Sequence, residues 1–187
     1  MSPLIQALSS YADYHRDRRN IATHLVGIPM IVAGVAVLLS RPQLAHLGAV
    51  ALSPALLLAA ACGAWYLRHD LRYGLVMAVL LAAVLALGQA AAAWSLAAWG
   101  ALGGGLFVAG WIIQFIGHAF EGRKPAFVDD LMGLVIGPLF VVAEVGFALG
   151  LRREVQQAVE VHSGPVRDHR EGHDGRSPLA GANGGRA

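Results

Sequence analysis

A stretch of 48 residues, from Tyr73 to Phe120, contains no Asp, Glu, Lys or Arg. An α-helix of that length, at about 1.5 Å per residue, is roughly twice as long as the hydrocarbon core of a bilayer is thick. The stretch must therefore turn back once, and the tryptophans and glycines at 94–105 make that segment the expected turn. This feature predicts two antiparallel membrane spans, near 74–93 and 103–120.

The overall composition also indicates a membrane protein. Of the 187 residues, 56% are hydrophobic and only 14% are charged, against about 25% charged in an ordinary soluble domain. The mean hydropathy is +0.56, and the net charge of +2 is too small to indicate a nucleic-acid partner. We therefore expect an all-α fold, a polytopic helix bundle in the membrane, and the sequence leaves its oligomeric state open.

The remaining apolar runs complete the expected bundle. Two further spans, near 23–40 and 45–67, bring the number of spans to four. A fifth element near 131–150 is interrupted by Gly137-Pro138, and it either crosses the membrane or is partly embedded as a broken helix.

Segments at the two ends differ from this apolar middle. Residues 3–17 predict a short amphipathic helix at the membrane surface. Beyond Arg153 the content of Gly, Ser, Pro and charged residues is typical of disorder, so we expect a membrane domain over 1–153 and a polar tail over 154–187.

The basic residues indicate how the bundle is oriented. They cluster at 16–19, 68–72 and 123–124, whereas the loop between the third and fourth expected spans has no charge. The positive-inside rule then places the N-terminus and the loops at 68–72 and 121–130 in the cytoplasm. Frequent Ala, Gly and Arg suggest a bacterial genome, so the expected location is the bacterial inner membrane.

This topology brings three histidines to one face of the membrane. His15 and His24 lie before and at the start of the first span, and His118 ends the fourth. Ionisable groups at membrane depth are rare and usually functional, and imidazole suits iron, zinc and copper. Residues 15 and 24 would face opposite ways on one straight helix, so their convergence requires a break between them. Glu121 follows His118 by three residues and shares its helix face. A rim histidine can also be only a wet, hydrogen-bonded side chain, and that alternative stays open here.

Two blocks carry a resemblance to a known family. The segments "YHRDRRNIATHLVGIP" and "WIIQFIGHAFEGRKPAFVDDLMGLVIGPLFVVAE" are similar to the small membrane proteins related to the fungal 2-hydroxy fatty acid dioxygenase of phytosphingosine α-oxidation. The resemblance covers roughly residues 5–150. It implies a multi-span membrane enzyme that uses Fe(2+) and O2 to shorten a 2-hydroxy fatty acid by one carbon, with membrane lipid around it.

The resemblance also implies roles for individual residues. His15, His24 and His118 would be the iron ligands, which leaves open positions for O2 and for a 2-hydroxy carboxylate. Glu121 and Arg123 are catalytic candidates, and Arg123 with Lys124 would bind the substrate carboxylate. The ligand imidazoles would be oriented by Tyr14, Asn20 and Gln114.

Two alternatives remain beside the dioxygenase. A b-type haem protein would use His24 and His118 as axial ligands, and a non-enzymatic lipid-binding protein or scaffold would use the polar rim for headgroups. A di-iron hydroxylase is disfavoured, because its closely spaced histidine boxes do not occur in the apolar part of the chain.

Overall fold

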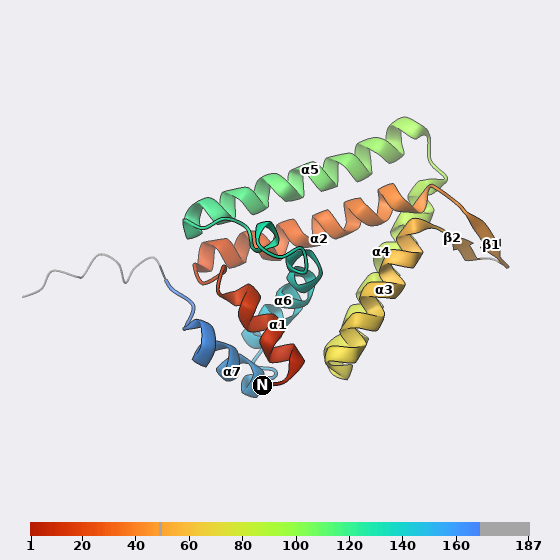
Figure 1. The fold of residues 1–187 in the computed structure, drawn as a ribbon. Helices are drawn as coiled ribbons and strands as arrows, with labels where there is room; N and C mark the ends of the chain where they lie inside the picture. The colour runs from red at the N-terminus through yellow and green to blue at the C-terminus, as the bar shows by residue number, and fades with distance from the viewer. Residues whose placement is uncertain (49, 169–187) are drawn as a thin grey trace, which may run out of the picture.

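The computed structural model describes residues 1–48 and 50–168 and is mainly helical over that part of the chain (Figure 1). Its elements run in the order α1 (Pro3–Ala12), α2 (Arg18–Ser40), β1 (Ala45–Leu47), β2 (Val50–Leu52), α3 (Pro54–His69), α4 (Leu71–Ala92), α5 (Leu96–Glu121), the 3-10 turn η1 (Ala126–Val128), α6 (Gly133–Ala148) and α7 (Arg153–Ser163).

The long helices α2 and α5 lie side by side along the molecule (Figure 1). Glycines allow the two backbones to approach closely. A Cβ atom at Gly34 of α2 would lie 2.7 Å from the backbone nitrogen of Phe107, and one at Gly110 of α5 would lie 2.8 Å from the carbonyl oxygen of Gly27. Small residues at such contacts are the usual basis of helix pairing in a bilayer.

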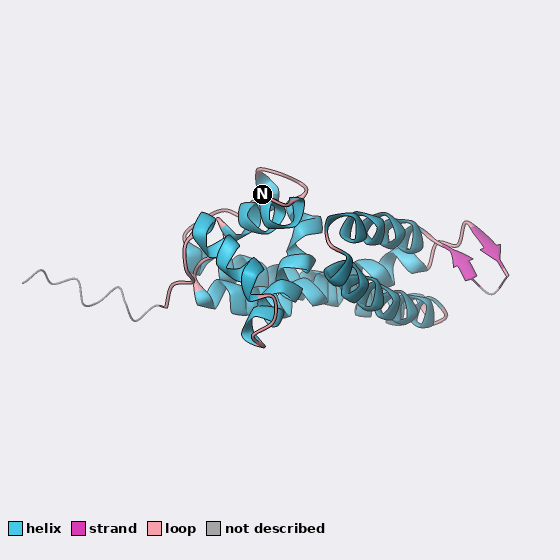
Figure 2. Ribbon diagram, turned by 90° about the horizontal axis from the view of Figure 1, so that it is seen from below, coloured by secondary structure: helices cyan, strands magenta, loops and turns pink. Residues whose placement is uncertain are grey.

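Three described helices are long and apolar enough to cross a membrane, namely α2, α4 and α5, with 23, 22 and 26 residues. The expected span over 45–67 differs from the structure. Its first part forms the antiparallel hairpin of β1 and β2, which stands apart from the helices (Figures 1 and 2). Helix α3 then starts at Pro54, where the Ser53 side chain accepts a hydrogen bond from the Leu56 amide. The remaining 16-residue helix is shorter than the roughly 20 residues of a typical span.

The turn between the two spans expected near 74–93 and 103–120 is earlier and shorter than expected, and the helices on its two sides, α4 and α5, diverge at a large angle instead of packing antiparallel (Figure 1). Helix α4 ends at Ala92 and α5 begins at Leu96, with the Ser95 hydroxyl accepting a hydrogen bond from the Ala98 amide. The glycines at 103–105 lie inside α5. Gly103 is needed there, since a Cβ atom would lie 2.8 Å from the side chain of Leu38 on α2.

The remaining helices α1, α6 and α7 gather near the N-terminal end of α2 (Figure 1). Helix α6 continues through Pro138, and the break expected there falls instead after Ala148, where α6 and α7 meet at a bend of 115°. Counting this bent pair as one span gives up to four crossings among the described residues.

The tail expected over 154–187 also begins differently. Residues 153–163 form α7, because Val155 and Val159 are four residues apart and bury one face of the helix against the rest of the chain. The part of the expected tail over 169–187 lies outside the described residues.

Candidate metal centre

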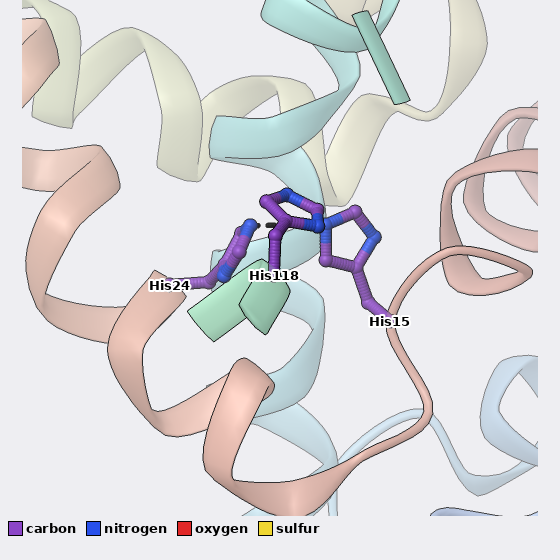
Figure 3. A group of neighbouring side chains, drawn as sticks. All are labelled: His15, His24 and His118. Atoms are coloured by element: carbon purple, nitrogen blue, oxygen red, sulfur yellow. Dashed lines mark hydrogen bonds between the residues drawn. The ribbon is translucent and has the colours of Figure 1, made fainter. Parts of the chain in front are cut away.

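Three imidazoles that are distant in the sequence meet in the structure. One ring nitrogen from each of His15, His24 and His118 lies within 4.8 Å of the other two. The ring centroids are 4.3 Å apart for His15 and His24 and 5.0 Å apart for each pair that includes His118. Figure 3 shows the three rings grouped between α2, the segment before it and the end of α5. The convergence that the topology predicted is therefore present.

The local folding of the N-terminal segment brings the first two rings together. Helix α1 ends at Ala12, and α2 begins at Arg18 with the Asp17 carboxylate capping its first turn. The helix break required between His15 and His24 thus lies at 13–17. His118 comes from the last turn of α5, which ends at Glu121 and is followed by Gly122 in the left-handed conformation.

Hydrogen bonds set the protonation pattern of two of the rings. His15 Nδ1 lies 2.6 Å from the carbonyl oxygen of Tyr11, and His24 Nδ1 lies 2.8 Å from that of Asn20. A carbonyl only accepts, so each Nδ1 carries the proton and each neutral ring has an unprotonated Nε2. These two Nε2 atoms face each other at 2.9 Å. Two lone pairs at that distance repel unless a cation lies between or beside them.

The third imidazole, that of His118, also indicates a bound cation. His118 is buried, and its Nδ1 has no hydrogen-bond partner among the described residues. A buried polar atom without a partner costs roughly 1–3 kcal/mol. Three imidazole nitrogens that face one another can act as the ligands of a metal ion such as iron, zinc or copper.

Aromatic packing keeps the rings dry and fixed. The Tyr11 ring stacks on His15 with centroids 4.1 Å apart, and Phe140 of α6 lies 5.7 Å from the same imidazole. His15 is fully buried, and this burial, together with the neighbouring His24, lowers the pKa of His15 well below its usual value. The neutral ring, which is the form that binds metals, is therefore favoured.

Glu121 anchors the segment that carries His15. Its Oε2 accepts hydrogen bonds from the amides of Arg16 (3.0 Å) and Asp17 (2.7 Å) and from the Asn20 side chain (3.1 Å). Its Oε1 pairs with Arg167 at 2.6 Å. Both carboxylate oxygens thus have donors, and Glu121 does not belong to the group of three ligand atoms.

The other residues expected around the imidazoles have different contacts. The Tyr14 hydroxyl donates a hydrogen bond to Asp129, and Asn20 accepts one from His24 through its backbone carbonyl, so neither side chain bonds to an imidazole. Arg123 donates to the carbonyl of Asp13, and Lys124 forms an ion pair with Asp129. Both basic residues border an open polar hollow and are absent from the lining of the cavity that reaches the imidazoles.

That cavity lies between α2, α5, α6 and the segment around η1. It has a volume of about 60 Å³, and its lining includes His24, His118 and Gln114 together with Tyr11 and Trp111, whose aromatic rings carry a hydroxyl and an indole N–H. Gln114 is buried, and its Nε2 has no hydrogen-bond partner among the described residues. The rest of the lining is apolar or backbone and comprises Ile28, Ile31, Val32, Pro125, Ala126, Phe127, Gly133, Leu134, Gly137 and Pro138.

The sequence reasoning missed one charged residue at the centre. Arg16 is only 5% exposed, whereas the sequence shows it only as one member of a basic cluster that indicates membrane orientation. Its Nε donates to the carbonyls of Ala12 and His15, and its Nη2 lies 3.7 Å from the Glu144 carboxylate. A hint was present in the sequence, since Glu144 is the one acid of the last apolar run and requires a partner.

The whole chain was also compared with known proteins. A family model described as 2-hydroxy-palmitic acid dioxygenase Mpo1-like matches residues 1–149. The 2-hydroxy-palmitic acid dioxygenase MPO1 of Saccharomyces cerevisiae is 31% identical over 155 residues, which cover 82% of this chain and 85% of the yeast protein. No solved structure matches the chain.

Proposed function

Because the chain belongs to the Mpo1-like family of 2-hydroxy-palmitic acid dioxygenases, we propose that it is an Fe(II)-dependent dioxygenase that shortens 2-hydroxy fatty acids by one carbon. The ligands of the iron are His15, His24 and His118. The enzyme works in the bacterial inner membrane. Its N-terminus and metal site lie at the cytoplasmic side, because the basic segments favour that orientation.

One observation carries the proposal. The unprotonated Nε2 atoms of His15 and His24 face each other at 2.9 Å, while both Nδ1 atoms are fixed by backbone carbonyls. A purely structural pair of neutral histidines would instead place a donor opposite an acceptor. Metal-binding histidines commonly use a carbonyl on the second ring nitrogen to fix the ring in this way.

The iron and the protein residues have different roles in the proposed site. Iron bound there would supply the chemistry that activates O2, which protein side chains lack. Tyr11 and Phe140 exclude water from the imidazoles, and Glu121 holds the segment that carries His15. The apolar cavity lies next to His24 and His118 and accepts the carbon atoms close to the acid group.

The overall reaction balances with O2 as the only oxidant. A 2-hydroxy acid RCH(OH)COOH and O2 give RCOOH, CO2 and H2O. The C1–C2 bond breaks, C2 is oxidised to the new carboxyl group, C1 leaves as CO2, and O2 is reduced. Equal amounts of O2 consumed and CO2 released are therefore expected.

The alternative of a b-type haem protein does not fit the arrangement of the rings. Axial ligands lie on opposite faces of the porphyrin, which separates them. Here His24 and His118 have centroids 5.0 Å apart and both contact His15. The rings leave no space for a macrocycle between them.

Oxygen uptake by the purified protein tests the proposal. The protein is prepared in detergent, loaded with Fe(II) and given 2-hydroxypalmitate, and we expect O2 consumption with formation of the C15 acid. Replacement of His15, His24 or His118 by Ala should abolish it, whereas His46→Ala in the distant β1 strand should not. Absence of turnover with 2-hydroxy acids of every chain length tested would contradict the assignment and favour a non-enzymatic lipid-binding role.

A further inference from the structure

Gln114 is a buried polar residue of the cavity whose hydrogen bonding the metal site does not explain. The residue is 4% exposed, and its Nε2 lies in the interior with no hydrogen-bond partner among the described residues. It precedes His118 by four residues on α5, so the two side chains share one helix face and both line the cavity. A buried amide that lacks a partner costs free energy and requires an explanation.

Packing against α2 fixes the position of this amide. A Cβ atom at Gly27 would lie 2.9 Å from Gln114 Nε2 and 2.9 Å from the carbonyl oxygen of Gly110. The amide therefore lies directly over the glycine that follows His24 by three residues. No hydrogen bond joins Gln114 to any of the three imidazoles, so orientation of a ligand ring does not explain it.

We propose that Gln114 contacts the substrate, donating a hydrogen bond from its side-chain amide to a carboxylate oxygen of the fatty acid bound beside His24 and His118. This inference rests on the proposed function and names the residue that recognises the acid group. A neutral donor suits this place, because a charged side chain without a partner would be costly between apolar helices. Arg123 and Lys124, the obvious carboxylate binders, lie outside this cavity.

The rest of the lining agrees with this orientation of the substrate. Ile28, Ile31 and Trp111 give the same cavity largely apolar walls, and Leu134, which also lines it, is 48% exposed at the surface of α6. A cavity of about 60 Å³ accommodates only the acid group and the first few carbon atoms. The remainder of the acyl chain passes out between the helices into the lipid.

Ligand binding to metal-loaded protein tests the proposal without turnover. Zn(II) replaces iron, and calorimetry measures the affinity for 2-hydroxypalmitate and for hexadecane-1,2-diol, which has hydroxyls at C1 and C2 but no carboxylate. Gln114→Leu should weaken binding of the acid by about 10- to 100-fold, the effect of one hydrogen bond to a charged group. The diol should change by less than about threefold, and bound zinc should remain at one equivalent. Gln89→Leu, on the exposed face of α4, is the matched control and should change neither affinity.

Each other outcome overturns the proposal. Equal losses for acid and diol would indicate a structural role for Gln114, and loss of zinc would indicate that it positions the imidazoles. If Gln114→Leu does not fold, the nearly isosteric Gln114→Glu replaces it, and it should also weaken binding of the acid more than that of the diol. An active wild-type enzyme with unchanged acid affinity in both variants would refute the role of Gln114 alone. An Fe(II)-loaded wild type that neither binds nor consumes 2-hydroxy acids would refute the proposed function as well.

Discussion

Replacement of Glu121 by Ala is expected to weaken metal binding, although Glu121 is no ligand in the structure. Its side chain is 0% exposed and its Oε2 accepts hydrogen bonds from the amides of Arg16 and Asp17 and from Asn20. The first two amides immediately follow His15. Without the carboxylate, the segment that carries His15 loses its attachment to the end of α5.

The size of the effect follows from the three donors left without a partner. An unsatisfied donor costs about 1–3 kcal/mol when buried, and water can reach part of this cluster, so we estimate about 2 kcal/mol in total. The ion pair with Arg167 adds little, because the arginine is 64% exposed. Because His15 must be in place to bind metal, 2 kcal/mol corresponds to a loss of about 30-fold in metal affinity. This value agrees with the 10- to 100-fold typical of residues that orient ligands.

Competition with a chelator measures that affinity for Zn(II) in wild type, Glu121→Ala and Glu121→Gln. The control is Glu154→Gln, which removes an exposed ion pair with Arg152 and should have no effect. If Glu121 acts only in catalysis, both Glu121 variants will lose turnover but keep wild-type metal affinity. A change in affinity of less than about threefold in Glu121→Ala would refute the anchoring role.

Further predictions concern pH and helix packing. Burial lowers the pKa of His15 in the folded protein. At pH values below about 6.5, the ordinary histidine pKa, this residue therefore binds a proton more readily in the unfolded chain than in the folded protein. The metal-free protein should therefore lose stability as the pH falls below about 6.5, and His15→Gln should make the melting temperature depend less on pH. A wild-type melting temperature that does not decrease as the pH is lowered below about 6.5 would contradict this prediction. Gly34→Ala should destabilise the protein by about 1–3 kcal/mol, because its Cβ atom would meet the backbone of Phe107. Gly104→Ala on α5 meets nothing within 4 Å and should be neutral or slightly stabilising in the same thermal assay, and equal effects of the two would refute the close packing of α2 on α5.

The convergence of the histidines was predictable because it depends on few properties of the chain. The absence of charge over 73–120 predicts two helices, and the basic clusters predict that His15, His24 and His118 lie on one face of the membrane. In the structure α5 packs along α2 in the opposite direction, which brings His118 beside His24 (Figure 1). The break between His15 and His24 also had to exist for the rings to meet, and it lies at 13–17. The membership of the family, too, was evident from two sequence blocks and is confirmed by the comparisons.

Element boundaries in the apolar sequence were less predictable. Residues 42–67 carry no charge, so hydropathy alone does not separate the hairpin from α3, and only Ser53-Pro54 marks the start of the helix. The polar composition of the C-terminal segment predicted disorder over 154–187, and the two valines that α7 buries are too few to predict a helix from the sequence.

Roles that depend on tertiary contacts could not be derived from the sequence. The spacing of Glu121 and His118 places both on one helix face and leaves open whether Glu121 binds the metal. In the structure the carboxylate accepts hydrogen bonds from the amides that follow His15. Gln114 was expected to support an imidazole, but its amide nitrogen lies against Gly27 without a hydrogen-bond partner among the described residues. Both outcomes depend on the angle between helices, which sequence patterns do not set.

X-ray absorption spectroscopy of the metal-loaded protein tests the central claim most directly. With Zn(II) bound, the account predicts one ion per chain and three imidazole nitrogens at about 2.0–2.1 Å. His118→Ala should lower the imidazole count to two and weaken binding. A stoichiometry far below one, or an oxygen-only coordination shell without imidazole scattering, would show that these three histidines do not form a metal site.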